Sequence, residues 1–292
     1  MHRLANQHVL TQKGLYVPVI VRQLLGFLYS QISAAIFAAF ILALVLLSKW
    51  IWGAAESWGW SAPLPLARYD FLFLCALFIQ MMFVIYGVET WEEVRVIAVF
   101  HLLGTFMELF KTHMGSWEYP EDNFFRIAGV PLFSGFMYAS VGSYIARAWR
   151  IYQFELIHFP TKIWNFLICS VIYFNFFFHH FGPDLRWGIF VIIAILYYRS
   201  RLSFLTSNGT RGRVPLLLIW FGFAALIYGA ENIATHARIW IYPSQREQWH
   251  PVPLPKFGSW YLLMIISFML VYLVHHDKMA HHILKRENLP CP

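Results

Sequence analysis

Long apolar stretches, separated by short polar or aromatic loops, recur along the whole chain. Eight stretches have the length and composition that predict helices. They are residues 31–53, 70–88, 94–113, 130–149, 163–180, 187–198, 214–235 and 259–276. Most approach the roughly 20 apolar residues with which a helix crosses the hydrocarbon core of a bilayer. The pattern predicts an all-α polytopic membrane bundle of about eight transmembrane helices.

Two of these stretches differ from the others. Residues 187–198 would form a helix only about 18 Å long, short of a hydrocarbon core of about 30 Å. Such a helix is either extended by snorkelling of Arg186 and Arg199 or buried against its neighbours. The fourth stretch instead carries small residues at helical spacings that permit close helix contact: Ser134, Gly135, Ala139, Ser140, Gly142 and Ser143.

One polar and aromatic motif occurs twice, each time at the end of an apolar stretch. The copies read ELFKTHMGSWEYP from Glu108 and ENIATHARIWIYP from Glu231. The matched positions are Glu108/Glu231, His113/His236, Trp117/Trp240, Tyr119/Tyr242 and Pro120/Pro243. Self-similarity at this long period indicates duplication. We expect two pseudo-repeated four-helix halves, residues 31–150 and 151–276, between an N-terminal cytoplasmic or interfacial segment (1–30) and a C-terminal cytoplasmic tail (277–292).

Composition supports a membrane protein and sets its orientation. Of 292 residues, 59% are hydrophobic and 13% are charged, which excludes an ordinary soluble domain. The net charge of +7 comes from basic residues at the ends of apolar stretches, so we expect the lipid bilayer, and no nucleic acid, as partner. Lys and Arg favour the loops on the side of both termini, which predicts cytoplasmic termini and extracytoplasmic motifs.

The two motif glutamates are the candidate catalytic residues. Glu108 and Glu231 lie about one turn inside the ends of their stretches, among apolar neighbours. A carboxylate at membrane depth is costly and normally faces the bundle interior for a purpose. The structural alternative is a helix ion pair between Glu108 and Lys111, but the second copy has Ala234 at that position. Buried together, one carboxyl could act as a general acid beside an ionised partner.

Further polar and aromatic residues are candidates for substrate binding. They are His113, Trp117, Tyr119, His236, Trp240, Tyr242, Asn232, His179, His180, Asp184 and Arg186. Each motif histidine lies about 140° around the helix from its glutamate, so the two side chains cannot share a face. If a pseudo-two-fold axis along the membrane normal relates the two halves, two Glu and two His could converge across it and hold a metal. The alternative is that the histidines bind loop carbonyls. The aromatic residues either cover the site or anchor the chain at the membrane interface.

Three phrases carry a family resemblance: the segment ELFKTHMGSWEYPEDNFFRIAGVPLFSGFMYASVGSY, the second motif, and the turn FFFHHFGPDLRWG. In these the chain resembles bacterial domain-of-unknown-function family 817, the YoaT-like integral membrane proteins, over nearly its whole length. The resemblance implies a multi-pass protein of the bacterial cell (inner) membrane. It does not point to a particular activity.

A weaker resemblance is to membrane-embedded lycopene cyclase and carotenoid hydratase domains. It rests on Glu108, Gly115, Trp117, Tyr119, Gly129 and Pro131. The cyclases follow the proline with paired carboxylates, where Leu132 and Phe133 stand here, so a shared scaffold is implied more than cyclase chemistry.

These observations lead to one functional hypothesis and two alternatives. The first is a polar pocket near the extracytoplasmic side that binds, or performs acid-catalysed chemistry on, an isoprenoid or lipid-like substrate. A small-solute or ion-coupled transporter is the first alternative, since paired intramembrane acids and a repeat suit it. The second is a structural or assembly protein. Helix interruptions fall at the ends of the stretches, which favours an enclosed pocket over a transporter.

Overall fold

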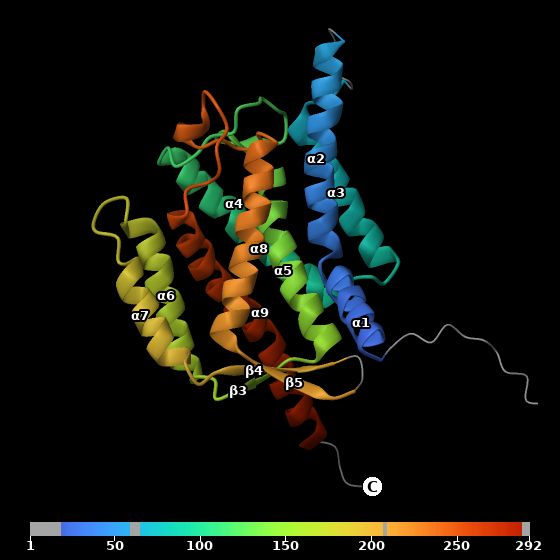
Figure 1. The fold of residues 1–292 in the computed structure, drawn as a ribbon, viewed down its shortest axis with the longest axis vertical. Helices are drawn as coiled ribbons and strands as arrows, with labels where there is room; N and C mark the ends of the chain where they lie inside the picture. The colour runs from blue at the N-terminus through green and yellow to red at the C-terminus, as the bar shows by residue number, and fades with distance from the viewer. Residues whose placement is uncertain (1–18, 59–64, 207–208, 288–292) are drawn as a thin grey trace, which may run out of the picture.

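The computed structural model describes residues 19–58, 65–206 and 209–287, which form a helical bundle with two small antiparallel sheets (Figure 1). The elements are α1 (Val19–Ala34), α2 (Ile36–Ser57), α3 (Arg68–Ile85), α4 (Trp91–His113), β1 (Arg126–Ile127), β2 (Val130–Pro131), α5 (Phe133–Tyr152), β3 (Glu155–Ile157), α6 (Lys162–Phe178), α7 (Arg186–Tyr197), β4 (Arg201–Leu205), β5 (Arg211–Pro215), α8 (Leu216–His236), a 3₁₀ turn (Pro243–Gln245) and α9 (Pro255–Glu287). Residues 1–18 of the predicted N-terminal segment and 288–292 of the tail lie outside the described residues.

Each of the eight apolar stretches coincides with one of the helices α2 to α9. Most of a further helix, α1, lies in the predicted N-terminal segment (1–30). A single residue, Ala35, separates α1 from α2. Among the described residues, four helices are long and apolar enough to cross a bilayer: α2, α3, α8 and residues Pro255–Leu273 of α9. The chain is therefore mostly helical, with four helices that suit a membrane. The crossing of the other four predicted spans stays a prediction.

The prediction of an all-α fold misses both sheets. Strands β3, β4 and β5 form an antiparallel sheet at the end of the bundle where α8 begins, with Leu202 opposite Leu156 and Val214. The strands are only three to five residues long, so their alternation is too brief to be recognised beside long helices. The other sheet is a hairpin of β1 and β2, in which Ala128 and Gly129 both have positive φ angles of 46° and 85°.

Helices α4 and α5 pack closely in the centre of the bundle because small residues line their contact. A Cβ atom added to Gly142 on α5 would lie 2.7 Å from the ring of Phe100 on α4. In the reverse direction, a Cβ atom on Gly104 would lie 2.5 Å from the ring of Tyr138. The absence of a side chain at Gly104 therefore lets Tyr138 lie against α4, one turn before Glu108.

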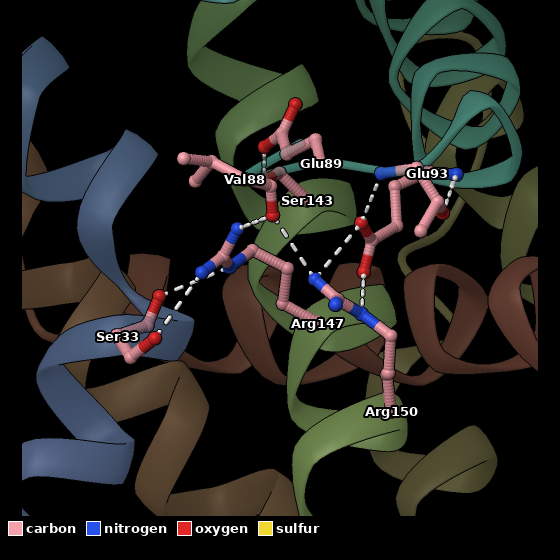
Figure 2. A network of polar contacts seen from close by, with 8 residues as sticks. Ser33, Val88, Glu89, Glu93, Ser143, Arg147 and Arg150 are labelled. Atoms are coloured by element: carbon pink, nitrogen blue, oxygen red, sulfur yellow. Dashed lines mark hydrogen bonds and ion pairs between the residues drawn. The ribbon is translucent and has the colours of Figure 1, made fainter. Parts of the chain in front are cut away.

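A polar network joins α1, α4 and α5 at the end of the bundle where α4 begins (Figure 2). Arg147, which is 5% exposed, donates to the carbonyls of Ser33 and Val88. Arg150 binds both oxygens of Glu93, at 2.9 and 3.3 Å. Glu93 also completes a capping box with the N-cap of α4. This network, which we call the basal network, fixes the α3–α4 turn on α5.

Candidate functional site

The two motif copies lie side by side at one end of the bundle and pair directly. The backbone N–H of Glu118 donates to the carbonyl of Ile241 at 3.0 Å, and the return bond from Ile241 measures 2.9 Å. The loops that carry them come from the ends of α4 and α8, so two segments more than a hundred residues apart form one surface (Figure 1). The predicted clustering of the two motifs is therefore a direct backbone contact.

The first turn of α3 holds both motif loops in place. Arg68 donates to the carbonyl of Ala237 at 2.8 Å, and the hydroxyl of Tyr69 donates to the carbonyl of Ile239 at 2.7 Å. The carboxylate of Asp70 accepts bonds from the backbone N–H groups of Phe124 and Phe125 at 2.8 Å each. These contacts satisfy loop backbone groups that would otherwise lack hydrogen-bond partners. Sequence reasoning did not predict these contacts.

Glu108 is buried, 3% exposed, and accepts hydrogen bonds from three uncharged donors. Its Oε2 atom accepts from the indole of Trp117 and from the hydroxyl of Tyr119, both at 2.7 Å. Its Oε1 atom accepts from the hydroxyl of Tyr138 at 2.8 Å. Three donors can carry a negative charge on a buried carboxylate without an ion pair, because every bond to it is charge-assisted. The motif supplies two of them, and α5 supplies the third.

Glu231 has the same burial and a related but incomplete shell. Its Oε1 atom accepts from the hydroxyl of Tyr242, and its Oε2 atom accepts from the indole of Trp260, at 2.5 Å each. The tyrosine is the motif residue that corresponds to Tyr119, whereas Trp260 comes from α9 and not from the second motif. The motif tryptophan, Trp240, is buried and bounds a cavity instead. The two copies therefore have equivalent tyrosines and non-equivalent tryptophans.

The two carboxylate shells meet through a ring contact. Trp117, bound to Glu108, and Tyr242, bound to Glu231, pack edge to face with their centroids 5.9 Å apart. The ammonium of Lys256 lies 4.6 Å from the Tyr242 centroid and 5.2 Å from the Trp117 centroid. These distances are within the range of a cation–π interaction. A cation is therefore held by the same two rings that hold the carboxylates.

A cavity of about 370 Å³, here called the apolar cavity, lies beside this cluster between α2, α5, α8 and α9. Most of its wall is aliphatic or aromatic, and its polar end contains both glutamates. Its lining includes Ala38, Leu42, Val141, Phe223, Ile227 and Leu263. The volume falls in the usual range for small-molecule sites, and a mostly apolar wall with few convergent polar groups is their usual composition.

A second cavity, of about 220 Å³ and here called the cationic cavity, lies on the other side of the cluster. Its charged lining residues are Lys111, Arg186, Lys256 and Glu231. It shares with the apolar cavity the side chains of Trp117, Tyr138, Glu231, Tyr242, Trp260 and Leu263. Because the same side chains line both spaces, the two cavities adjoin at a shared wall formed by these side chains.

The α6–α7 turn contributes the basic side of the cationic cavity. The ammonium of Lys111 donates to Nε2 of His180 at 2.7 Å and to Nε2 of His179 at 3.3 Å. The Nδ1 atom of His179 lies 2.9 Å from the carbonyl of Asn175, so this ring carries its proton on Nδ1. The local pair of Glu108 with Lys111 is not formed in the described part of the chain, because Lys111 turns toward the histidines.

Asp184 neutralises one cation of this group and fixes its position. It forms a salt bridge with Arg186 and accepts from the side chain of Asn175 at 3.2 Å. Burial works to raise the pKa of Asp184, but the hydrogen bonds from Arg186 and Asn175 outweigh it and hold that pKa below its usual value. Arg186 also donates to the hydroxyl of Ser259 at 2.9 Å, which ties the turn to the start of α9.

Three candidate residues lie away from the cluster. His113 and His236 are exposed at the ends of α4 and α8, as their angular offset from the glutamates implies. The ring of His236 packs against Trp249, with centroids 4.9 Å apart. Asn232 binds the backbone N–H of Val252 and so fastens the loop before α9. The hypothesis that both histidines converge with both glutamates is therefore wrong, and no group of three metal-ligating side chains occurs among the described residues.

Sequence reasoning missed Tyr138, Trp260 and Lys256. The first two are single aromatic residues in a chain that is 19% aromatic, so no spacing marked them. Lys256 carried a signal, since it is a lone cation where an apolar stretch begins and the first half has Leu132 in the corresponding place. This difference between the two halves, lysine in one and leucine in the other, therefore marked Lys256, the cation that the rings hold.

Comparison with known proteins identifies the family. A family model described as "Protein of unknown function (DUF817)" matches residues 23–268. The chain is also 41% identical over 252 residues to the "Uncharacterized protein YoaT" of Bacillus subtilis (strain 168), a match that covers 86% of this chain and 91% of that protein. No solved structure matches. These matches confirm the family resemblance found in the paired motif, and the chain belongs to the DUF817 family.

Proposed function

We propose that this protein holds an isoprenoid or similar lipid-like substrate in the apolar cavity and presents it to Glu231. The observation that carries the proposal is an apolar cavity of about 370 Å³ that ends at two buried carboxylates. Apolar walls select a hydrocarbon chain, and the carboxylates are the only acids in the described lining. The two glutamates then differ in role, because three donors hold Glu108 and two hold Glu231.

The chemistry that suits this site is proton transfer to a carbon–carbon double bond. Protonated Glu231 gives its proton to one alkene carbon, the π electrons form the new C–H bond, and the other carbon becomes cationic. Loss of a proton from a neighbouring carbon to the Glu231 carboxylate forms a new double bond and restores the acid, so no oxidant is needed. Trp117 and Tyr242 also line the apolar cavity, and their rings on that side would stabilise such a cation. Glu108 would remain ionised as the counter-charge.

The membrane arrangement belongs to the same proposal. Helices α2 to α9 would all cross the bacterial inner membrane, in two related halves (31–150 and 151–276) with cytoplasmic termini. The paired motif backbones and the equivalent bonds of Tyr119 and Tyr242 support a common origin of the halves. In this orientation the carboxylate cluster lies near the extracytoplasmic side, where a substrate can enter from the lipid phase.

The proposal is tested by filling the apolar cavity. Ala38 and Ala43 lie on the same helix, but only Ala38 lines the cavity, and Ala43 is exposed. We expect native mass spectrometry of the protein in mild detergent to show a bound lipid-like molecule in wild type and in Ala43→Leu, and to show its loss in Ala38→Leu. Glu231→Gln should retain the molecule in unreacted form. An empty wild type, or equal occupancy in both alanine variants, would contradict the proposal and favour a transporter or a structural role.

A further inference from the structure

We propose that the cationic cavity binds the phosphate headgroup of the same substrate, so that the ligand is a phosphate-bearing isoprenoid amphiphile. This rests on the proposed function, because the tail is taken to occupy the apolar cavity. A pure hydrocarbon in the apolar cavity would leave the cationic cavity without a ligand. Its lining is rich in cations and lies on the side away from the aliphatic wall.

Charge in the cationic cavity is unbalanced. The lining contains three cations, Lys111, Arg186 and Lys256, and a single acid, Glu231. Asp184 compensates Arg186 through a salt bridge. Neither lysine has a salt bridge within the part of the chain that the structure describes, although Lys111 is only 6% exposed. Burying a cation without an anion is costly unless a ligand supplies the charge.

The neighbours of the two lysines are uncharged acceptors and ring faces. Lys111 contacts the ring nitrogens of two histidines and lies 4.3 Å from the Phe176 ring centroid, and Lys256 contacts the Trp117 and Tyr242 rings. Such contacts leave the ammonium N–H groups of Lys256 free to turn toward an anion. The Ser259 hydroxyl, held by Arg186, adds a further polar group at the same wall.

A phosphate monoester matches this environment better than a carboxylate. It carries a charge of about −1.5 to −2 at neutral pH, which suits a cavity with more cations than acids in its lining, whereas a carboxylate carries only one negative charge. Basic pockets between membrane helices are an established way to bind lipid headgroups. The cavity of about 220 Å³ bears the cations, and the adjoining space of about 370 Å³ is apolar.

The position of the wall then determines where the ligand meets Glu231. Glu231, Trp117 and Tyr242 line both cavities. A ligand with its headgroup on one side and its tail on the other passes the wall at the carbons next to the phosphate. The double bond that Glu231 would protonate is therefore one near the headgroup, and the phosphate fixes the register of the chain.

The test compares farnesyl phosphate, farnesol and inorganic phosphate as probes, with the full chain in lipid nanodiscs and titration calorimetry as readout. We expect farnesyl phosphate to bind wild type at least tenfold more tightly than farnesol, and inorganic phosphate to bind far more weakly than either. Lys256→Met should remove the tenfold preference and leave farnesol affinity unchanged. The matched control is Lys162→Met, an exposed lysine at the start of α6 that lines neither cavity.

The outcomes separate the headgroup proposal from the proposed function. Equal affinities for farnesyl phosphate and farnesol, both lost in Ala38→Leu, would overturn the phosphate site and leave the lipid cavity intact. Tight binding of inorganic phosphate that Ala38→Leu does not alter would show a free-anion site and overturn the amphiphile. No binding of either prenyl probe would contradict both proposals. A tenfold preference that Lys256→Met and Lys162→Met reduce equally would also overturn the assignment, because it would reflect net charge alone.

Discussion

The described part of the molecule buries carboxylates in two regions, which differ in the partners that hold these carboxylates. In the basal network, the guanidinium of Arg150 binds Glu93, and Glu89 accepts from Ser143 and Gln80 with Arg147 close by (Figure 2). At the paired motifs, Glu108 and Glu231 are bound only by tyrosine hydroxyls and tryptophan indoles. Two lysines of that end, Lys111 and Lys256, bind other partners and face a cavity.

The difference separates a structural cluster from a site that can bind a ligand. Opposite charges that neutralise each other within the protein leave little net charge to attract a ligand. Uncharged donors hold a carboxylate in position while leaving its charge, and that of the nearby lysines, to act on an incoming molecule. Buried ionisable groups within membrane helices therefore need to be sorted by their partners before a function is assigned.

The largest effect should come from the basal network. Arg147→Met removes the guanidinium that donates to the carbonyls of Ser33 and Val88. It also removes a positive charge near the carboxylate of Glu89. We expect a loss of about 4 kcal/mol in the free energy of unfolding, because buried polar groups lose their donor and the buried carboxylates of Glu89 and Glu93 lose a nearby cation. Denaturant unfolding in detergent measures it. The control is Arg246, which forms an exposed salt bridge with Glu118, since Arg246→Met should change stability far less. An equal loss in both variants would remove the contrast between the regions.

The next effect distinguishes the two motif glutamates. Glu108→Leu orphans three buried donors and Glu231→Leu orphans two, at about 1 kcal/mol or more for each. We expect losses of about 3 and about 2 kcal/mol. The Gln variants should be milder, because a tyrosine hydroxyl can turn to accept from the amide. If Glu231→Leu is the more damaging variant, Glu231 has a structural role that its bonds do not reveal.

A smaller effect concerns Asp184 and depends on pH. The pKa of Asp184 is lowered in the folded state, because the bonds from Arg186 and Asn175 outweigh burial. A lowered pKa contributes stability above the unfolded value of about 3.9, and that stability is lost as the pH falls through the folded value. Asp184→Asn should therefore unfold at a lower temperature than wild type at neutral pH, and the two should converge in acid. A constant difference across this range would mean that charge is not the cause.

The smallest change in stability is expected for Lys256→Met. The variant loses cation–π contacts but no salt bridge within the described residues, so the free energy of unfolding should change by less than about 1 kcal/mol. The same variant should lose the tenfold preference for farnesyl phosphate over farnesol. Thermal unfolding beside the binding titration checks both. A large loss of stability would place Lys256 with the structural cations of the basal network.

Local pattern accounts for the elements that sequence reasoning found. Helices α2 to α9 follow from apolar stretches that demand internal hydrogen bonding of their backbone. The small residues Gly135 and Gly142 predicted a close helix contact on α5, and the structure identifies α4 as the partner. The structure shows that Tyr119 and Tyr242, at the same spacing in each motif, bind their own carboxylates, a contact that the sequence analysis did not predict. The sheet of β3, β4 and β5 was missed because it joins short segments that are distant in sequence.

The sequence by itself determined the family, DUF817, the apolar helices, four of which among the described residues could cross a membrane, and a carboxylate and aromatic motif that occurs twice, because these features depend on local composition and spacing. Only the tertiary structure decided which side chains complete the site. Tyr138 and Trp260 reach the glutamates, and Lys256 reaches the rings, from helices whose rotation and depth are set by packing against distant segments. The same packing left one cavity apolar and the other cationic on the two sides of one wall.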